Sequence, residues 1–410
     1  MSRIIPFDAY RPRPDLVDKV AALPYDVYKR AEAKEFVSTH PESFLRIDRP
    51  ETLFDDDFDM YSQEAYDKAR DVLREDIKNG TYIREDKKVY YIYELIMNGR
   101  SQTGIVAAVS LDDYLNGTVK KHENTLAAKE QDRINHIYNC SAQTGPIFLA
   151  YRDRSLINEV VAKVKNTEKT YGFVAEDGIT HNVWVINDPA DIEVIKDEFG
   201  KENNIYIADG HHRAASAVKV GLKKREENPG YTGEEDFNFF LSVLFPESEL
   251  EILPYNRVVK DTNGLSEEEF IEKISQICDV KKVDEAYQPA EKGIFGMYLG
   301  GSWYELKVHD DFKSDDPVTG LDVSILQTNI LGPILGIEDP RTDKRIDFVG
   351  GIRGLGELER RANSDMKLAF SMYPTSISEL FDVADAGLLM PPKSTWFEPK
   401  LRSGIFIHEI

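Results

Sequence analysis

The sequence predicts a mixed α/β fold, in which strands and helices alternate along most of the chain. Apolar runs of strand length recur from residue 89 onward, and stretches with helical spacing separate them. Because 410 residues exceed the usual size of one hydrophobic core, two or three structural units are expected. We expect an N-terminal α/β region over residues 1–115, a central core over residues 116–250 and a C-terminal α/β region over residues 251–410.

The N-terminal region contains signals for one helix and one hairpin. Prolines interrupt residues 1–50 and predict short elements and loops, with a turn at residues 23–26. Apolar residues at helical spacing predict a helix over residues 62–79, which Asn79-Gly80 ends. Residues 89–96 and 102–109 predict two strands, with the hairpin turn at residues 98–100.

Helix and strand signals then alternate through the central core. The expected elements are a helix over residues 122–140, a strand over 145–151, a helix over 156–164, a strand over 181–186, a helix over 192–199, a strand over 204–208 and a helix over 213–220. Further strands are expected at residues 239–244 and 295–299, and an acidic helix at 266–277 has Ser266 as its N-cap. This alternation is the basis of the α/β prediction.

Composition argues against several classes of partner. The 73 acidic and 51 basic side chains give a formal net charge of −22, which repels a phosphate backbone, so no nucleic-acid partner is expected. Cys140 and Cys278 show no CxxC spacing, so neither a disulfide framework nor a structural zinc site is supported. The sequence shows neither a signal peptide nor an apolar membrane-spanning run, and we expect a cytoplasmic protein with no membrane partner.

The densest candidate site is the motif Asp209-Gly210-His211-His212-Arg213, which follows an apolar strand and opens a helix. Glycine permits a sharp turn, and the N–H groups at a helix start attract anions such as phosphate. The imidazoles and the guanidinium add donors, and Asp209 is a candidate Mg²⁺ ligand. Neither a P-loop nor a strand-linked GxGxxG motif occurs elsewhere. The structural alternative is one histidine capping the helix, with Arg213 paired to a surface carboxylate.

A second polar cluster begins at Lys120-Lys121-His122-Glu123 and extends through Lys129 to Arg133. His122-Glu123 does not continue as HExxH, so a zinc protease site is not indicated. Such a charge run fits either a solvated helix face or a functional site. In the functional interpretation, Glu123 takes a proton from a hydroxyl group, and Lys121, Lys129 and Arg133 are additional phosphate contacts.

The C-terminal stretch from Met390 to Lys400 is too rich in proline for regular structure. Lys393 and Lys400 are candidate phosphate contacts. An ordered packing loop anchored by Trp396 explains the same residues equally well. The sequence does not decide between these interpretations.

Two resemblances connect these motifs. Residues 121–125, 208–213 and 390–400 together resemble the family known as domain of unknown function 1015, over essentially the whole chain. The order of His122-Glu123, then Pro146-Ile147 opening a strand, then residues 209–213 is similar to that of free serine kinases of the ParB/sulfiredoxin superfamily. This second resemblance covers the central third and implies a ParB/sulfiredoxin-like core with flanking α/β regions.

The resemblance to serine kinases implies Mg²⁺-dependent transfer of phosphate from ATP or ADP to a hydroxyl acceptor, with free L-serine giving O-phosphoserine. It makes Glu123, with His122 and His211, catalytic candidates, and residues 209–213 the nucleotide-phosphate site. The chain departs from the smaller kinases by a long insertion between Ile147 and Asp209 and by large flanking regions, which leaves donor and acceptor open. The cysteine of sulfiredoxins is absent where His211 stands, which disfavours sulfinic acid repair.

Two other function classes remain open. A ParB-like module that binds or hydrolyses nucleotide as a switch for a protein partner would bind nucleotide without phosphorylating any small acceptor. A metal-dependent hydrolase would release phosphate with no acceptor present. Whether the chain forms a homodimer is also left open by the sequence.

Overall fold

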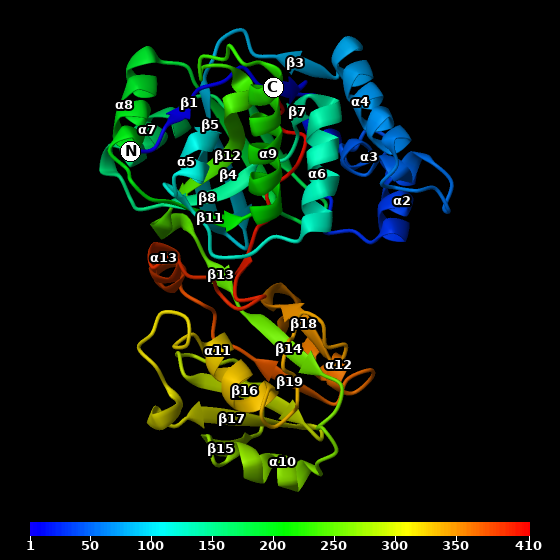
Figure 1. Cartoon of the computed structure of the whole chain (residues 1–410), viewed down its shortest axis with the longest axis vertical. Helices are drawn as coiled ribbons and strands as arrows, with labels where there is room; N and C mark the ends of the chain where they lie inside the picture. The colour runs from blue at the N-terminus through cyan, green and yellow to red at the C-terminus, as the bar shows by residue number, and fades with distance from the viewer. The chain divides into compact units, whose positions relative to one another are not determined.

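The computed structural model describes all 410 residues, which divide into two compact units (Figure 1). Unit 1 contains Met1–Leu250 and Pro399–Ile410, and unit 2 contains Glu251–Glu398. Each unit has its own β-sheet with helices packed on it, which confirms the predicted mixed α/β class. The last twelve residues return to unit 1, so its two segments are separated in sequence by the whole of unit 2.

A nine-stranded mixed sheet forms the centre of unit 1. Its strands are β1 (Ile4–Ile5), β4 (Tyr90–Met97), β5 (Arg100–Ser110), β6 (Val119–Lys120), β8 (Ile147–Tyr151), β9 (Tyr171–Val174), β10 (Thr180–Ile186), β11 (Ile205–Asp209) and β12 (Phe239–Pro246). They lie in the order β6-β11-β8-β12-β5-β4-β10-β9, and β1 pairs with β5. Strand β11 runs parallel to β6 and β12 runs parallel to β8, whereas the other pairs are antiparallel.

The predicted hairpin and most predicted helices of unit 1 are confirmed, with small differences at their ends. Asn98 and Gly99 form the hairpin turn with φ angles of 52° and 80°. The helices are α4 (Gln63–Lys78), α5 (Leu111–Leu115), α6 (Ala127–Cys140), α7 (Ser155–Lys165), α8 (Pro189–Gly200) and α9 (His211–Glu227). Helices α6 and α9 pack side by side on one face of the sheet (Figure 1).

One predicted helix starts later than expected. The prediction placed its start at His122, but α6 begins at Ala127 and the preceding residues form a loop. The backbone N–H groups of His122 and Leu126 donate to imidazoles of α9 instead of continuing a helix. The helical interpretation of this segment is therefore wrong for its first five residues, because tertiary hydrogen bonds replace helical ones.

The remaining elements of unit 1 surround a second hydrophobic core beside the sheet. They are α1 (Val17–Val20), α2 (Arg30–Thr39), α3 (Leu45–Asp48) and the strand pairs β2 (Tyr10–Pro12) with β3 (Tyr82–Arg84) and β7 (Ala142–Gln143) with β21 (His408–Glu409). Isolated bridges join Ala22 to Ser403 and Tyr10 to Ile407. The C-terminal segment is therefore hydrogen-bonded to the N-terminal region of the same unit.

Unit 2 contains a six-stranded antiparallel sheet in the order β15-β17-β16-β19-β14-β18. Its elements are β13 (Ile252–Leu253), β14 (Tyr255–Val259), α10 (Glu267–Ile274), β15 (Cys278–Val283), β16 (Ile294–Leu299), β17 (Ser302–Val308), α11 (Asp322–Leu326), β18 (Ile346–Gly350), α12 (Gly354–Ala362), β19 (Leu368–Ser371), α13 (Ile377–Asp385) and β20 (Trp396–Phe397). Helix α12 packs on the sheet. Ser266 caps α10 as predicted.

The structure contains neither a membrane-type helix nor a disulfide. No helix is both long enough and apolar enough to cross a bilayer. Cys140 and Cys278 are buried and free, and burial raises the pKa of each thiol to about 12. Both thiols are therefore protonated at neutral pH and poorly nucleophilic.

Candidate functional site

The central feature of unit 1 is the turn between β11 and α9. Strand β11 ends at Asp209, and Gly210 then adopts φ +94° as the N-cap of α9. Residues with a side chain rarely adopt this left-handed conformation, so glycine is required here. The first N–H groups of α9 have no acceptor within the helix and face the turn, which favours an anion there. The predicted strand, turn and helix are all confirmed.

Asp209 lies in this turn as an ionised carboxylate. Its Oδ1 accepts a hydrogen bond of 2.8 Å from the N–H of Gly210, and its Oδ2 accepts one of 2.8 Å from Lys400 Nζ. The surrounding protein by itself would raise the pKa of Asp209, but Lys400, Arg213 and His211 outweigh this and lower it to about 2. Lys400, whose position the sequence left open, thus belongs to the site.

His122 and His211 form a buried imidazole pair next to the turn. The N–H of His122 donates to Nε2 of His211 at 3.4 Å, and the two rings meet edge to face with their centroids 4.4 Å apart. Burial lowers the pKa of His122 to about 4, and burial together with the charge of nearby groups lowers that of His211 well below its usual value. Both rings are therefore neutral at pH 7. Because Nε2 of His211 is the acceptor, its proton resides on Nδ1.

Glu123 faces that Nδ1 atom of His211. The distance from Nδ1 to Oε2 of Glu123 is 4.0 Å, and the Glu123 side chain is 35% exposed. This separation exceeds hydrogen-bonding distance, and the side chain of Glu123 is partly open to solvent. The loop that carries Glu123 is held at its far end, where the N–H of Leu126 donates to Nε2 of His212 at 2.9 Å. The imidazoles of His211 and His212 thus hold the two ends of the loop that carries Glu123, the predicted base.

Arg213 lies on another side of α9, against a small cavity that we name the Asp209 cavity. Arg213 NH1 donates to the carbonyl of Pro146 at 3.1 Å. The Asp209 cavity has a volume of about 20 Å³, close to the space that one water molecule needs. It is lined by Pro24, Pro146, Phe148, Asp209, Gly210, Arg213, Lys400 and Leu401. This cavity therefore adjoins the turn where an anion is expected.

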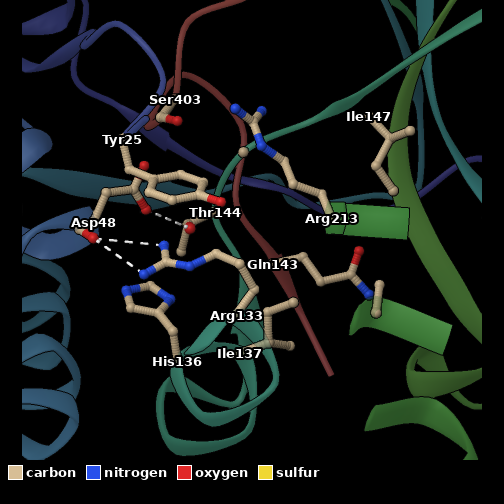
Figure 2. Close-up of a pocket in the computed structure, with 12 residues that line it drawn as sticks. Tyr25, Asp48, Arg133, His136, Ile137, Gln143, Thr144, Ile147, Arg213 and Ser403 are labelled. Carbon is tan, nitrogen blue, oxygen red and sulfur yellow. Dashed lines mark hydrogen bonds between the residues drawn. The ribbon is translucent and has the colours of Figure 1, made fainter. Parts of the chain in front are cut away.

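Arg213 also lines a second cavity, of about 30 Å³, that we name the Tyr25 cavity. Figure 2 shows the Tyr25 ring between the guanidinium groups of Arg133 and Arg213, whose central carbons lie 4.0 Å and 5.9 Å from the ring centroid. The lining residues are Tyr25, Asp48, Arg133, His136, Ile137, Gln143, Thr144, Gly145, Ile147, Arg213, Ala217 and Ser403. Sequence reasoning missed Tyr25, Asp48, Thr144 and Ser403 as site residues.

The other predicted phosphate contacts lie in different surroundings. Lys121 lies over the ring of Tyr114, with Nζ 4.5 Å from its centroid. Lys129 is exposed on α6 and lines neither cavity. Arg133 forms part of the Tyr25 cavity wall. Lys393 belongs to unit 2, where its carbonyl accepts a hydrogen bond of 3.1 Å from Arg257.

The turn offers one protein ligand to a metal ion. No cluster of three or more His, Cys, Asp or Glu side chains arranged to hold a metal occurs in the structure. Magnesium in phosphate-transfer sites commonly uses only one or two carboxylates together with substrate phosphates and water. Asp209, which is ionised and 47% exposed, fits that requirement as a single carboxylate ligand.

The fold and this turn define a mixed α/β protein with a candidate anion-binding site at a strand–helix junction. A family model described as "Protein of unknown function (DUF1015)" matches residues 4–324. The chain belongs to this family, as the motifs predicted. A search of curated proteins finds no match.

Solved structures show only distant similarity to this chain. SbnI from Staphylococcus aureus, with a C-terminal truncation, is 11% identical, with a TM-score of 0.38, and the match covers 72% of this chain and 82% of that one. A free serine kinase in complex with AMP is 14% identical, with a TM-score of 0.35 and coverage of 78% and 93%. A conserved hypothetical protein from Pyrococcus furiosus is 14% identical, with a TM-score of 0.33 and coverage of 74% and 94%.

Proposed function

We propose that this protein is a Mg²⁺-dependent phosphotransferase that moves a phosphoryl group from ATP or ADP to the hydroxyl of a small acceptor, with free L-serine as the first candidate. The observation that carries the proposal is the placement of Glu123 beside His211. His211 belongs to the short motif that forms the candidate anion-binding turn. The resemblance of these motifs to those of free serine kinases supports the same chemistry.

The turn would hold the phosphates of the donor. The helix N-terminus supplies N–H groups, and the side chains of Arg213 and Lys400 supply positive charge. Lys400 currently pairs with Asp209, so a bound phosphate would share or displace that contact. When bound, magnesium would neutralise phosphate charge, with Asp209 as its protein ligand.

Glu123 would act as the base in this mechanism. The acceptor hydroxyl transfers its proton to the carboxylate while its oxygen forms a new bond to the terminal phosphorus of the donor. The bond from that phosphorus to the bridging oxygen breaks, which releases ADP from ATP, or AMP from ADP. The Nδ1–H of neutral His211 faces this carboxylate at 4.0 Å without placing a full positive charge beside it.

The proposal is tested by incubating the purified protein with Mg²⁺, ATP or ADP, and a panel of small hydroxyl compounds that includes L-serine. We expect O-phosphoserine, detected by mass spectrometry, with wild-type protein and almost none with Glu123→Gln. Absence of a phosphorylated product from every acceptor would contradict the proposal. Bound but unconsumed nucleotide would then favour the switch module, and phosphate release without an acceptor would favour a hydrolase.

A further inference from the structure

The Tyr25 cavity contains hydrogen-bond donors that the protein itself does not use. Arg213 makes one hydrogen bond, to the carbonyl of Pro146, and its nearest carboxylate is the exposed Asp26, 3.9 Å away. The hydroxyls of Tyr25 and Ser403 line the same cavity and form no hydrogen bond within the protein. One guanidinium and two hydroxyl groups are thus available to a ligand.

The other polar groups of the wall already have partners. Arg133 pairs with Asp132 at 2.8 Å, and the hydroxyl of Thr144 donates to Oδ1 of Asp48 at 2.9 Å (Figure 2). The amide of Gln143 bonds to the backbone of β12 through both its nitrogen and its oxygen. Arg133, Thr144 and Gln143 therefore form the wall of the cavity with their polar groups already bonded. The donors left for a ligand belong to Tyr25, Arg213 and Ser403.

The size of the cavity limits what it can hold. Its volume of about 30 Å³ admits a group of a few atoms and is too small for a nucleobase. Gly145 keeps the space open, because a Cβ there would lie 3.0 Å from Oγ of Ser403 and 3.2 Å from NH1 of Arg213. A small group with several acceptor oxygens therefore matches the cavity in both size and chemistry.

We propose that the Tyr25 cavity binds the carboxylate of the hydroxyl acceptor, so that the acceptors of this protein are small hydroxy acids. A planar guanidinium fork flanked by hydroxyl donors is well suited to the two oxygens of a carboxylate. Arg213 lines both cavities, so it faces the acceptor's carboxylate on one side and the phosphate-binding turn on the other. This inference rests on the proposed function and specifies its substrate class.

The test measures binding rather than turnover, so that it remains informative if no transfer is seen. Calorimetry with L-serine, glycerate and ethanolamine is carried out on the full chain, with and without a non-hydrolysable ATP analogue. We expect both carboxylates to bind, and ethanolamine to bind at least about tenfold more weakly, because it leaves the guanidinium unpaired.

Two conservative variants locate the binding site. Tyr25→Phe and Ser403→Ala each remove one donor that has no partner in the protein, so folding should be little affected. Each should weaken binding of L-serine and glycerate by about fivefold, the effect of one hydrogen bond, and leave the ATP analogue unaffected. Tyr231→Phe, at an exposed position that lines neither cavity, is the matched control.

The outcomes separate this inference from the proposed function. Carboxylate binding that depends on Tyr25 and Ser403, without any phosphoryl transfer, supports the cavity assignment and counts against the kinase. Transfer to an acceptor without a carboxylate, or equal binding of ethanolamine and L-serine, overturns the assignment and leaves the kinase intact. A loss of affinity for the ATP analogue alone would assign the cavity to the donor phosphates and overturn the inference.

Discussion

The two sides of the first turn of α9 differ in charge and burial, although the residues that form them are adjacent in sequence. On one side, His211 is buried and neutral between His122 and Glu123. On the other side, Arg213 is a cation that lines two small cavities. Successive helical residues point about 100° apart, so one short motif can serve two environments. In the proposed mechanism, Glu123 and His211 serve proton transfer and Arg213 serves anion binding, so neighbouring residues of one helix start have different tasks.

The largest expected effect is a loss of kcat when Glu123, the proposed base on the neutral side, is replaced. Glu123→Gln should lower kcat by roughly 100-fold or more, the usual loss when a general base is removed, while nucleotide affinity stays unchanged. Steady-state kinetics and calorimetry measure the two quantities. Glu226→Gln, at an exposed position near the end of α9, is the matched control. A change in kcat of less than about twofold would remove Glu123 from the mechanism.

The burial of the neutral side predicts a pH-dependent stability. The pKa of His122 is about 4 in the folded protein, whereas it is about 6.5 in an unfolded chain. As the pH falls below about 6.5, the unfolded state therefore binds a proton before the folded state does, and stability is lost. This residue should account for about 2 kcal/mol of the loss between pH 7.5 and 5.0.

The variant His122→Phe tests this difference. Because both ring nitrogens of His122 lack a partner, phenylalanine leaves no new polar group unsatisfied. Denaturant titrations should show that the fall in unfolding free energy between the two pH values becomes smaller by about 2 kcal/mol. His309→Phe, at a partly exposed position of unit 2, is the control. An unaltered pH dependence in His122→Phe would show that its imidazole is not the group that titrates.

A smaller effect is expected at the glycine that joins the two sides. Gly210→Ala should destabilise the protein by about 1–2 kcal/mol, because alanine is strained in the left-handed conformation. An added Cβ would approach no atom closer than 3.7 Å, so the cost is conformational rather than steric. Thermal unfolding measures it. Gly356→Ala, inside α12 without a positive φ, should be neutral or stabilising. Equal effects of the two substitutions would contradict the required turn conformation.

The smallest effect is expected on the cationic side, at the partly buried ion pair of Asp209 and Lys400. The pKa of Asp209 is lowered to about 2, so its ionisation supports the folded state above about pH 4 and this contribution is lost as the pH falls toward 2. Lys400→Met should raise the pKa of Asp209 and move acid unfolding to a slightly higher pH. Carboxyl NMR and circular dichroism measure the two shifts, and Lys129→Met is the control. An unchanged pKa would contradict the pairing.

Much of the fold could be predicted because its signals are local. The hairpin at Asn98-Gly99, the cap at Ser266 and the turn at Gly210 are each specified by residues within a few positions. The family was also predictable from three motifs. In each case, the residues that determine the conformation are also neighbours in the sequence.

The remaining site residues could not be predicted because their positions depend on tertiary contacts. Tyr25 lies in a segment predicted only as a turn, and Ser403 lies beyond the flagged C-terminal motif, yet both line one cavity with Arg213. Lys400 was a candidate, but its contact with Asp209 spans 191 positions. The helix start predicted at His122 was wrong for the same reason. The N–H groups of His122 and Leu126 bond to histidines that lie far along the chain.

The central claim is that the two sides of the α9 start perform different functions, and steady-state kinetics of Glu123→Gln, Tyr25→Phe and the double variant test it most directly. The account predicts that Glu123→Gln lowers kcat with little change in the acceptor KM, that Tyr25→Phe raises the acceptor KM by about fivefold with little change in kcat, and that the two effects multiply. If both single variants lowered kcat alone, or the double variant were no worse than Glu123→Gln, this division of functions would be contradicted.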